Sequence, residues 1–197
     1  SIGALHKFDR DFINKVNDKE FSLPKKNIIS IILGGDNNHY KFSLAEIEKL
    51  IIKIKEIKKI YPNYNILIIS SRRTPQKIKE ILSENLKNIA IVGKEGEKNP
   101  YTYALKYSSF FVISSDSTSM ISECAITGKP IFIFHLPFKR RSKRIENFHK
   151  QFEKLKITKN LEKENHFSSW TYNSLNESKR IASIVKERII KEVYESK

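Results

Sequence analysis

Short apolar runs alternate with amphipathic segments along most of this chain, and this alternation restricts its fold more than any other feature. The first run, Ile28–Leu33, is apolar apart from one serine and ends in Gly34-Gly35. Similar runs follow at Asn65–Ile69, Ile89–Val92, Phe110–Ser114 and Pro130–Phe134. Runs without polar alternation are typical of strands covered on both faces. The sequence therefore predicts five buried parallel strands.

The segments between the runs carry helix signals. Ser43 with Glu46 three residues later has the spacing of a capping box, and apolar residues then recur at helical spacing. Thr74-Pro75 supplies a cap and a first-turn proline to the next helix. Two more helices are expected over 100–107 and 117–127. Strands that alternate with helices predict an α/β fold, a three-layer Rossmann-like domain with a mainly parallel sheet of about five or six strands.

The pattern suggests three parts of the chain. Residues 26–155 form the predicted Rossmann-like domain, with a helix near 145–155. Residues 1–25, with one weak helix over 9–19, are interpreted as a lead-in from a missing N-terminal domain. Residues 156–197 are expected to form an irregular crossing segment and a last helix, about 175–194, that packs on the same domain.

Composition excludes several classes of protein. The 197 residues suffice for one ordinary domain. The single cysteine, Cys124, leaves no intramolecular disulfide and no thiolate zinc module, which suits a reducing compartment. No apolar run reaches the roughly 18 residues of a membrane span, and no export signal is evident. We expect a cytoplasmic protein, or one held peripherally at the inner face of a membrane.

The net charge of +15 is a weak signal for nucleic acid. The chain has 29 Lys against 8 Arg and 30 Ile against 6 Ala, a bias typical of AT-rich codons. Many lysines lie beside glutamates, as on a solvated helix face. Nucleic acid is therefore not an expected partner. The basic run Lys139–Arg144 leaves three hypotheses open: a solvated loop, a contact to an anionic acceptor or to the donor diphosphate, and attraction to an anionic membrane.

Polar residues follow four of the five predicted strands. Gly34-Gly35, the segment Ser71-Arg72-Arg73-Thr74, Asn99-Pro100-Tyr101 and the segment from Asp116 all lie just after a strand. Open parallel sheets bind ligands at the carboxyl ends of their strands. These segments therefore form the predicted binding edge.

The segment from Asp116 to Glu123 carries the most specific signal. Its hydroxyl-rich turn opens a helix whose free N–H groups and positive dipole end suit a phosphate. Asp116, Ser119, Met120 and Glu123 fall on one helical stripe. A Glu123 carboxylate on the ligand side could accept hydrogen bonds from ribose hydroxyls. The alternative is an ordinary capped helix with Glu123 on a solvated flank.

The other motifs also have structural explanations. The glycine pair can be an ordinary turn, Arg72 and Arg73 can be surface residues, and Asn99-Pro100 can simply begin a helix. Cys124 on an apolar helix face is typical of a buried small residue. The five histidines show no metal-ligand spacing, so no metal site is expected.

Five ordered blocks together resemble a known family. They are Gly34-Gly35, Ser71–Pro75, Asn99–Tyr101, Asp116–Glu123 and Thr127–Pro130. Over roughly residues 1–155 the chain resembles the mitochondrial-fission Elm-type family, whose bacterial members are regarded as candidate glycosyltransferases. At longer range it is similar to the donor-binding C-terminal half of GT-B glycosyltransferases, such as the lipid II-forming enzyme of peptidoglycan synthesis.

The resemblance implies a donor site for a nucleoside diphosphate sugar. Carried over by position, Gly34, Gly35, Ser117 and Ser119 would lie near the diphosphate and Glu123 near the ribose. The other candidates are placed near the sugar or phosphate only by their position at the edge. The full set of donor-site candidates is Gly34, Gly35, Ser71, Arg72, Arg73, Thr74, Asn99, Tyr101, Asp116, Ser117, Ser119, Met120 and Glu123.

GT-B enzymes have two Rossmann-like domains, whereas this chain contains one. The resemblance implies that the catalytic base lies in the missing N-terminal domain and that this part alone is inactive. The predicted edge has no Asp-x-Asp pair, and helix N–H groups with Arg72 or Arg73 could offset the diphosphate charge, so we expect transfer without a metal or cofactor. The acceptor is unknown and could be lipid-linked or a glycan. Two other hypotheses remain open: a non-catalytic interaction module that holds an acidic protein, a membrane or nucleic acid, and a nucleotide-sugar epimerase.

Overall fold

A parallel sheet forms the centre of the computed structural model, which describes residues 1–93, 96, 98–164 and 166–195. The described residues form six strands in the order β3-β2-β1-β4-β5-β6, and every neighbouring pair is parallel. The strands are β1 (Ile28–Leu33), β2 (Asn65–Ser70), β3 (Ala90–Val92), β4 (Phe110–Ser114), β5 (Ile131–Phe134) and β6 (Thr158–Asn160). The predicted Rossmann-like α/β class is confirmed.

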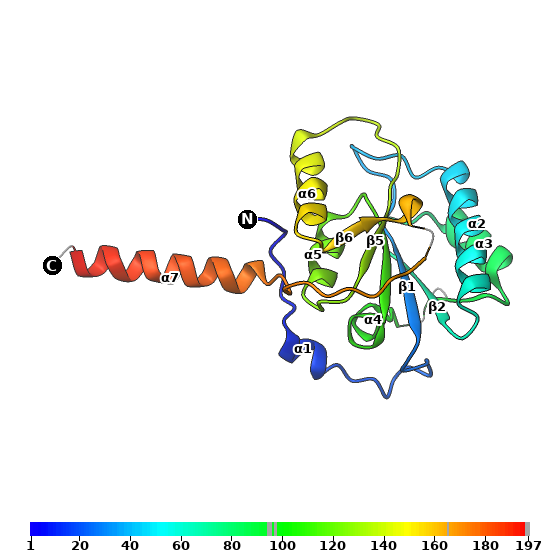
Figure 1. Cartoon of the computed structure of the whole chain (residues 1–197), viewed down its shortest axis with the longest axis horizontal. Coiled ribbons are helices and arrows are strands. Elements are labelled where there is room, and N and C mark those ends of the chain that lie inside the picture. Colours follow the sequence, from blue (N-terminus) through cyan, green and yellow to red (C-terminus); the bar gives the residue numbers. More distant parts are fainter. Residues whose placement is uncertain (94–95, 97, 165, 196–197) are drawn as a thin grey trace.

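Helices cover both faces of the sheet (Figure 1). On one face lie α2 (Leu44–Ile60) and α3 (Gln76–Leu86); on the other lie α1 (Arg10–Asn14), α4 (Tyr101–Tyr107), α5 (Thr118–Ala125) and α6 (Lys143–Lys154). The side chains of β1 divide between these layers, because successive side chains of a strand point to opposite faces. Ile29 and Ile31 join the α2 and α3 core, whereas Ile28 and Ile32 join the other.

The edges of the sheet differ from the sequence prediction. β3 is an edge strand on which Ile91 is 38% exposed, so it is not covered on both faces. β6 lies within the segment that we expected to be an irregular crossing. It is three residues long and polar, and short strands of this kind are common at the edge of a sheet.

Two helix starts also differ in detail. Ser43 is the N-cap residue of α2, as predicted, but its side chain makes no capping hydrogen bond, and Glu46 pairs with Lys49 instead. The N-cap residue of α3 is Pro75 rather than Thr74, whose hydroxyl donates to the Gly34 carbonyl. The Thr74 side chain therefore stabilises the turn after β1 instead of capping α3.

The lead-in segment packs against the α4 and α5 face. Ile13 on α1 is buried, and the Tyr103 hydroxyl on α4 donates to the Leu23 carbonyl at 2.9 Å. The amide of Ala4 donates to Ser122 Oγ on α5 at 2.9 Å. Residues 1–25 thus form part of the packing of this face.

The last helix, α7 (Glu177–Glu195), projects away from the sheet (Figure 1). Its first turn is anchored, since Ile2 N–H donates to the buried Glu177 carboxylate at 2.7 Å. Beyond that turn most of the described apolar side chains are exposed, with Val185 at 47%, Ile189 at 56% and Val193 at 54%. The expectation that this helix packs on the domain was wrong. Helical periodicity in a sequence marks an apolar stripe but not what covers it.

Removing α7 beyond its first turn should leave the sheet domain intact. A chain that ends at Arg180 keeps the Glu177 anchor and loses, among the described side chains, apolar groups that are exposed apart from the half-buried Ile181. The thermal midpoint should therefore change by less than about 3 °C. Ile54→Ala is the destabilising control, because the Ile54 side chain is fully buried. Its expected loss of unfolding free energy is about 2–5 kcal/mol. Thermal unfolding followed by circular dichroism measures both. A truncation as damaging as Ile54→Ala would show that α7 packs on the domain.

Candidate functional site

The strand order creates one crevice at the carboxyl edge of the sheet. From β1 the chain moves outward through β2 and β3, then returns to the other side of β1 to form β4, β5 and β6. The order therefore reverses between β1 and β4, and open α/β sheets bind ligands outside the strand ends at such a point. Gly34-Gly35 follows β1 there, and Ser115-Asp116-Ser117 follows β4.

The Asp116 carboxylate joins the strand ends at this point. Its side chain is 0% exposed and receives hydrogen bonds from Gly35 N–H at 3.0 Å and the Ser114 hydroxyl at 2.6 Å. Arg73, from the segment after β2, places Nη2 2.8 Å from Asp116 Oδ2. Asp116 thus lies beneath the predicted binding edge and holds the ends of β1, β2 and β4 together.

Internal packing explains the glycine pair. A Cβ on Gly34 would lie 1.9 Å from Asp116 Oδ2, and a Cβ on Gly35 would lie 2.1 Å from the Arg73 carbonyl oxygen. Both distances are far below van der Waals contact, so no larger residue fits. The two glycines are required by the chain itself, whatever approaches from outside.

Ser71 and Thr74 also direct their hydroxyls inward. Both donate to the Gly34 carbonyl, Ser71 Oγ at 3.1 Å and Thr74 Oγ1 at 2.5 Å. The Ser71 amide donates to the Leu33 carbonyl at 2.9 Å. These two predicted donor-site residues therefore belong to the support of the turn after β1.

The start of α5 offers free donors at the crevice. Ser117 is the N-cap residue, and its Oγ accepts from Met120 N–H at 3.4 Å. The first amides of a helix have no acceptor within it, and those of Thr118 and Ser119 have no hydrogen-bond acceptor among the described residues. Ser119 is exposed, whereas Met120 packs partly buried against the α4 and α5 core.

Glu123 lies against the start of α4. Its Oε2 accepts a 2.5 Å hydrogen bond from the Tyr101 hydroxyl. Burial, together with the neighbouring Cys124 and Glu123, raises the pKa of Tyr101 well above its usual value, so this hydroxyl remains a donor. Asn99 caps the same turn by accepting from Tyr101 N–H at 3.0 Å. The sequence predicted all three as donor-site residues, and in the structure Tyr101 is hydrogen-bonded to both of the others.

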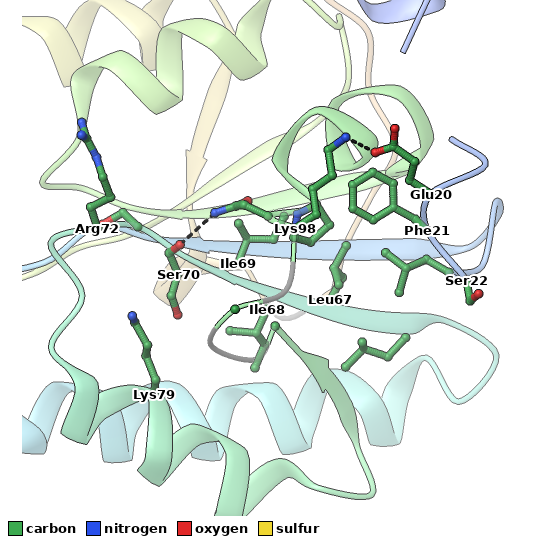
Figure 2. A pocket seen from close by; sticks show the side chains of 17 residues that line it. Glu20, Phe21, Ser22, Leu67, Ile68, Ile69, Ser70, Arg72, Lys79 and Lys98 are labelled. Atoms are coloured by element: carbon green, nitrogen blue, oxygen red, sulfur yellow. Dashed lines mark hydrogen bonds and ion pairs between the residues drawn. The ribbon is translucent and has the colours of Figure 1, made fainter. Parts of the chain in front are cut away.

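A cavity of about 570 Å³ opens beside Asn99, at the start of α4 (Figure 2). Its floor includes Leu67 and Ile69 of β2, whereas Arg72 and Lys79 lie along one side. Asn99 donates to the Ser70 carbonyl at 3.3 Å at the end of β2. Of the two predicted arginines, Arg72 thus lines the cavity and Arg73 binds Asp116.

Two histidines and a tyrosine at this edge gave no sequence signal. His135 and His149 stack edge to face with ring centroids 5.5 Å apart, and His149 Nε2 lies 3.0 Å from the Ser115 carbonyl oxygen. The Tyr40 hydroxyl is buried without a hydrogen-bond partner among the described residues, and burial raises its pKa to about 12. The contacts of these three residues depend on the order of the strands, which a sequence pattern does not reveal.

Comparison with known proteins gives consistent results. The family model described as "Mitochondrial fission ELM1" matches residues 1–189. An uncharacterized protein of Rickettsia prowazekii is 32% identical over 169 residues, which cover 82% of this chain and 46% of that protein. The mitochondrial fission protein ELM1 of Arabidopsis thaliana is 24% identical over 199 residues, with 96% and 45% covered. The chain spans less than half the length of each relative.

Gly34→Ala should destabilise the domain strongly. The added methyl would lie 1.9 Å from Asp116 Oδ2, so the expected loss of unfolding free energy is about 3 kcal/mol or more. Gly93→Ala is the matched control, because among the described residues the nearest atom to an added Cβ, the Ile68 carbonyl oxygen, would lie 4.0 Å away. Urea denaturation measures both free energies. Equal effects would mean that the Asp116 carboxylate is not packed on Gly34.

His149 should make stability depend on pH below neutrality. Burial and the neighbouring His135 lower the pKa of His149 to about 4, whereas an unfolded histidine titrates near 6.5. Between these values the unfolded chain binds the proton more readily, so stability falls as the pH falls from about 6.5 to 4. His149→Gln should remove about 1–3 kcal/mol of this change. His166→Gln, at an exposed position, is the control, and the same slope in both variants would contradict the assignment.

Proposed function

This chain belongs to the mitochondrial fission ELM1 family, and we propose that its sheet domain binds the donor nucleotide sugar of a glycosyltransferase. The observation that carries the proposal is the meeting of a Gly-Gly turn and a helix N-terminus at the point where the strand order reverses. This arrangement is the usual ligand position of an open α/β sheet.

The diphosphate would bind at the start of α5. The amides of Thr118 and Ser119 and the positive end of the helix dipole favour an anion there. Arg73 adds positive charge at this position, because its side chain remains 41% exposed while it is paired with Asp116. A guanidinium has five N–H donors, so one edge can bind Asp116 and another a phosphate.

The ribose would bind at Glu123. This residue lies five positions beyond Thr118, about 7.5 Å along the helix axis, comparable to the reach from a nucleotide's phosphate to its ribose hydroxyls. Tyr101 occupies Glu123 Oε2 and leaves Oε1 to accept from a hydroxyl. The Tyr101 hydrogen bond also fixes the carboxylate, which reduces the entropy lost on binding.

The nucleobase would enter the cavity at the end of β2. Two strand spacings, about 10 Å, separate β2 from β4, a distance that a nucleotide can bridge. The apolar floor suits the ring face, and Asn99 with the backbone at the end of β2 offers polar partners at the mouth. Arg72 and Lys79 add positive charge on the side where the phosphates approach.

Transfer itself would require further groups, such as those in the additional length of the relatives. Among the candidate donor-site residues, the Glu123 and Asp116 carboxylates are both hydrogen-bonded within the chain, and Asp116 is fully buried. We therefore assign donor binding to this chain and leave the catalytic base to the part that the longer relatives also contain. Acceptor and sugar are not assigned.

Titration calorimetry of the 197-residue chain with UDP, GDP and their sugars tests donor binding. We expect saturable binding of one nucleotide, with the free diphosphate contributing most of the affinity. Failure of every nucleotide to bind below millimolar concentrations, from folded protein, would contradict the proposal and favour a non-catalytic interaction module.

Glu123→Ala tests the ribose assignment separately. Loss of its hydrogen bonds should weaken nucleotide binding by about 1–3 kcal/mol without unfolding the domain. Glu84→Ala, at an exposed position on α3, should change neither binding nor stability. If Glu123→Ala binds nucleotide as tightly as the parent chain, its carboxylate is a structural partner of Tyr101 and not a ribose ligand.

A further inference from the structure

A cationic edge follows β5, and the proposed donor site does not use it. It consists of Phe138, Lys139, Arg140 and Arg141 in the loop between β5 and α6, with Lys143 and Arg144 in the first turn of α6. All six residues are exposed, and Phe138 is 38% exposed despite its apolar ring.

The loop of the cationic edge is held in place by backbone bonds to the loop after β1. Lys139 N–H donates to the His39 carbonyl at 2.8 Å, and Lys41 N–H donates to the Pro137 carbonyl at 2.9 Å. The Phe138 ring stacks on Tyr40 with centroids 4.6 Å apart. The charges are therefore presented on a supported loop.

Most of these charges are not balanced within the chain. Lys139 pairs with Asp36. In the described ranges, Arg140, Arg141, Lys143 and Arg144 form no ion pair with a carboxylate. Lys143 and Arg144 also lie at the positive end of the α6 dipole, where cations are unfavourable. Stability of the helix does not explain their placement.

The positive charge continues into a groove beside α6. The groove has a volume of about 600 Å³ and lies between α6 and residues 1–4. Its lining includes the cations Arg144, Lys150 and Lys154, and none of the described residues that line it is acidic. Phe148 and Ile145 contribute apolar surface to the same groove. A ligand that fits carries negative charge next to an apolar part.

We propose that the cationic edge and this groove dock the protein onto an anionic phospholipid bilayer. Unpaired cations near such a membrane are attracted to its surface potential, and aromatic side chains favour the headgroup region. An anionic phospholipid combines the charge and the apolar part that the groove requires. Nucleic acid fits less well, because its phosphates would leave the apolar lining uncovered.

The inference is independent of nucleotide binding and adds to the proposed function if both hold. The cationic edge is bonded to the loop after β1, which adjoins the crevice between β1 and β4. Docking would hold that crevice near the bilayer surface. If the proposed function is correct, the acceptor would then be a membrane-borne molecule.

Sedimentation with lipid vesicles tests the proposal. The 197-residue chain is mixed with vesicles of phosphatidylcholine alone or with about 30% phosphatidylserine. The edge variant is Arg140→Gln, Arg141→Gln, Lys143→Gln. The matched control is Lys55→Gln, Lys59→Gln, Lys87→Gln, which removes the same charge from exposed positions on or next to α2 and α3. Circular dichroism establishes that each variant is folded.

We expect the parent chain to bind only the vesicles that contain phosphatidylserine. Each cation near such a surface contributes about fivefold in affinity, so the edge variant should bind about 100-fold more weakly, and the control within about threefold of the parent. Equal losses of vesicle affinity in both variants would show that binding depends only on net charge, which would overturn the proposal. Tighter binding of duplex DNA than of vesicles, lost in the edge variant, would also overturn it.

Nucleotide titration of the edge variant separates this inference from the proposed function. Retained nucleotide affinity with lost vesicle binding is the expected result. Nucleotide binding without any vesicle binding by the parent chain would contradict the docking surface alone. Vesicle binding without nucleotide binding would contradict only the donor site.

Discussion

The buried Asp116 carboxylate is the interaction on which this edge of the sheet depends. A carboxylate removed from water requires partners that replace its hydration. Here Gly35 N–H, the Ser114 hydroxyl and the Arg73 guanidinium supply them. Each partner comes from a different strand end, so the bonds that stabilise the charge also fix the relative positions of β1, β2 and β4. Gly34 follows from this requirement, because a side chain there would displace the carboxylate, whereas Gly35 is required by the nearby Arg73 carbonyl.

This arrangement divides the polar residues at the edge into two groups. Ser71, Thr74 and Asp116 direct their hydrogen-bonding groups inward and complete the support of the turn after β1. A second group remains available at the surface: the amides at the start of α5, the outer side of Arg73, and the Arg72 side chain. Because the first group is hydrogen-bonded within the chain, the backbone that carries the second group is held in place, which reduces the conformational entropy lost on ligand binding. Polar residues that look equivalent in the sequence thus have different roles.

The sequence predicts the strands well because each buried strand is a continuous apolar run between helix signals. It predicts the edge residues too, because in a parallel α/β fold the residues after each strand share one edge. It does not predict β6, whose polar residues lie at an edge. It predicts α7 as a helix but not its projection, because the apolar stripe of α7 looks like that of a packed helix. Within the site, Tyr101 and Glu123 were both predicted but not as a bonded pair. The order of the strands decides such contacts, and one sequence contains no direct record of that order.

A continuous set of bonds links the crevice to the cationic edge. The side-chain Nδ2 of Asn37 donates to the Asp116 backbone carbonyl at 3.2 Å. The Oδ1 of Asn37 accepts from the backbone amides of His39 and Tyr40. His39 in turn accepts from the backbone after Phe138. Coupling between two sites requires an element with two arrangements, and these bonds describe only one. Their effect is therefore geometric: a surface that contacts the loop after β5 is held at a fixed position relative to the start of α5. A ligand bound at the crevice would consequently lie at a fixed distance from that surface, whatever its chemical identity.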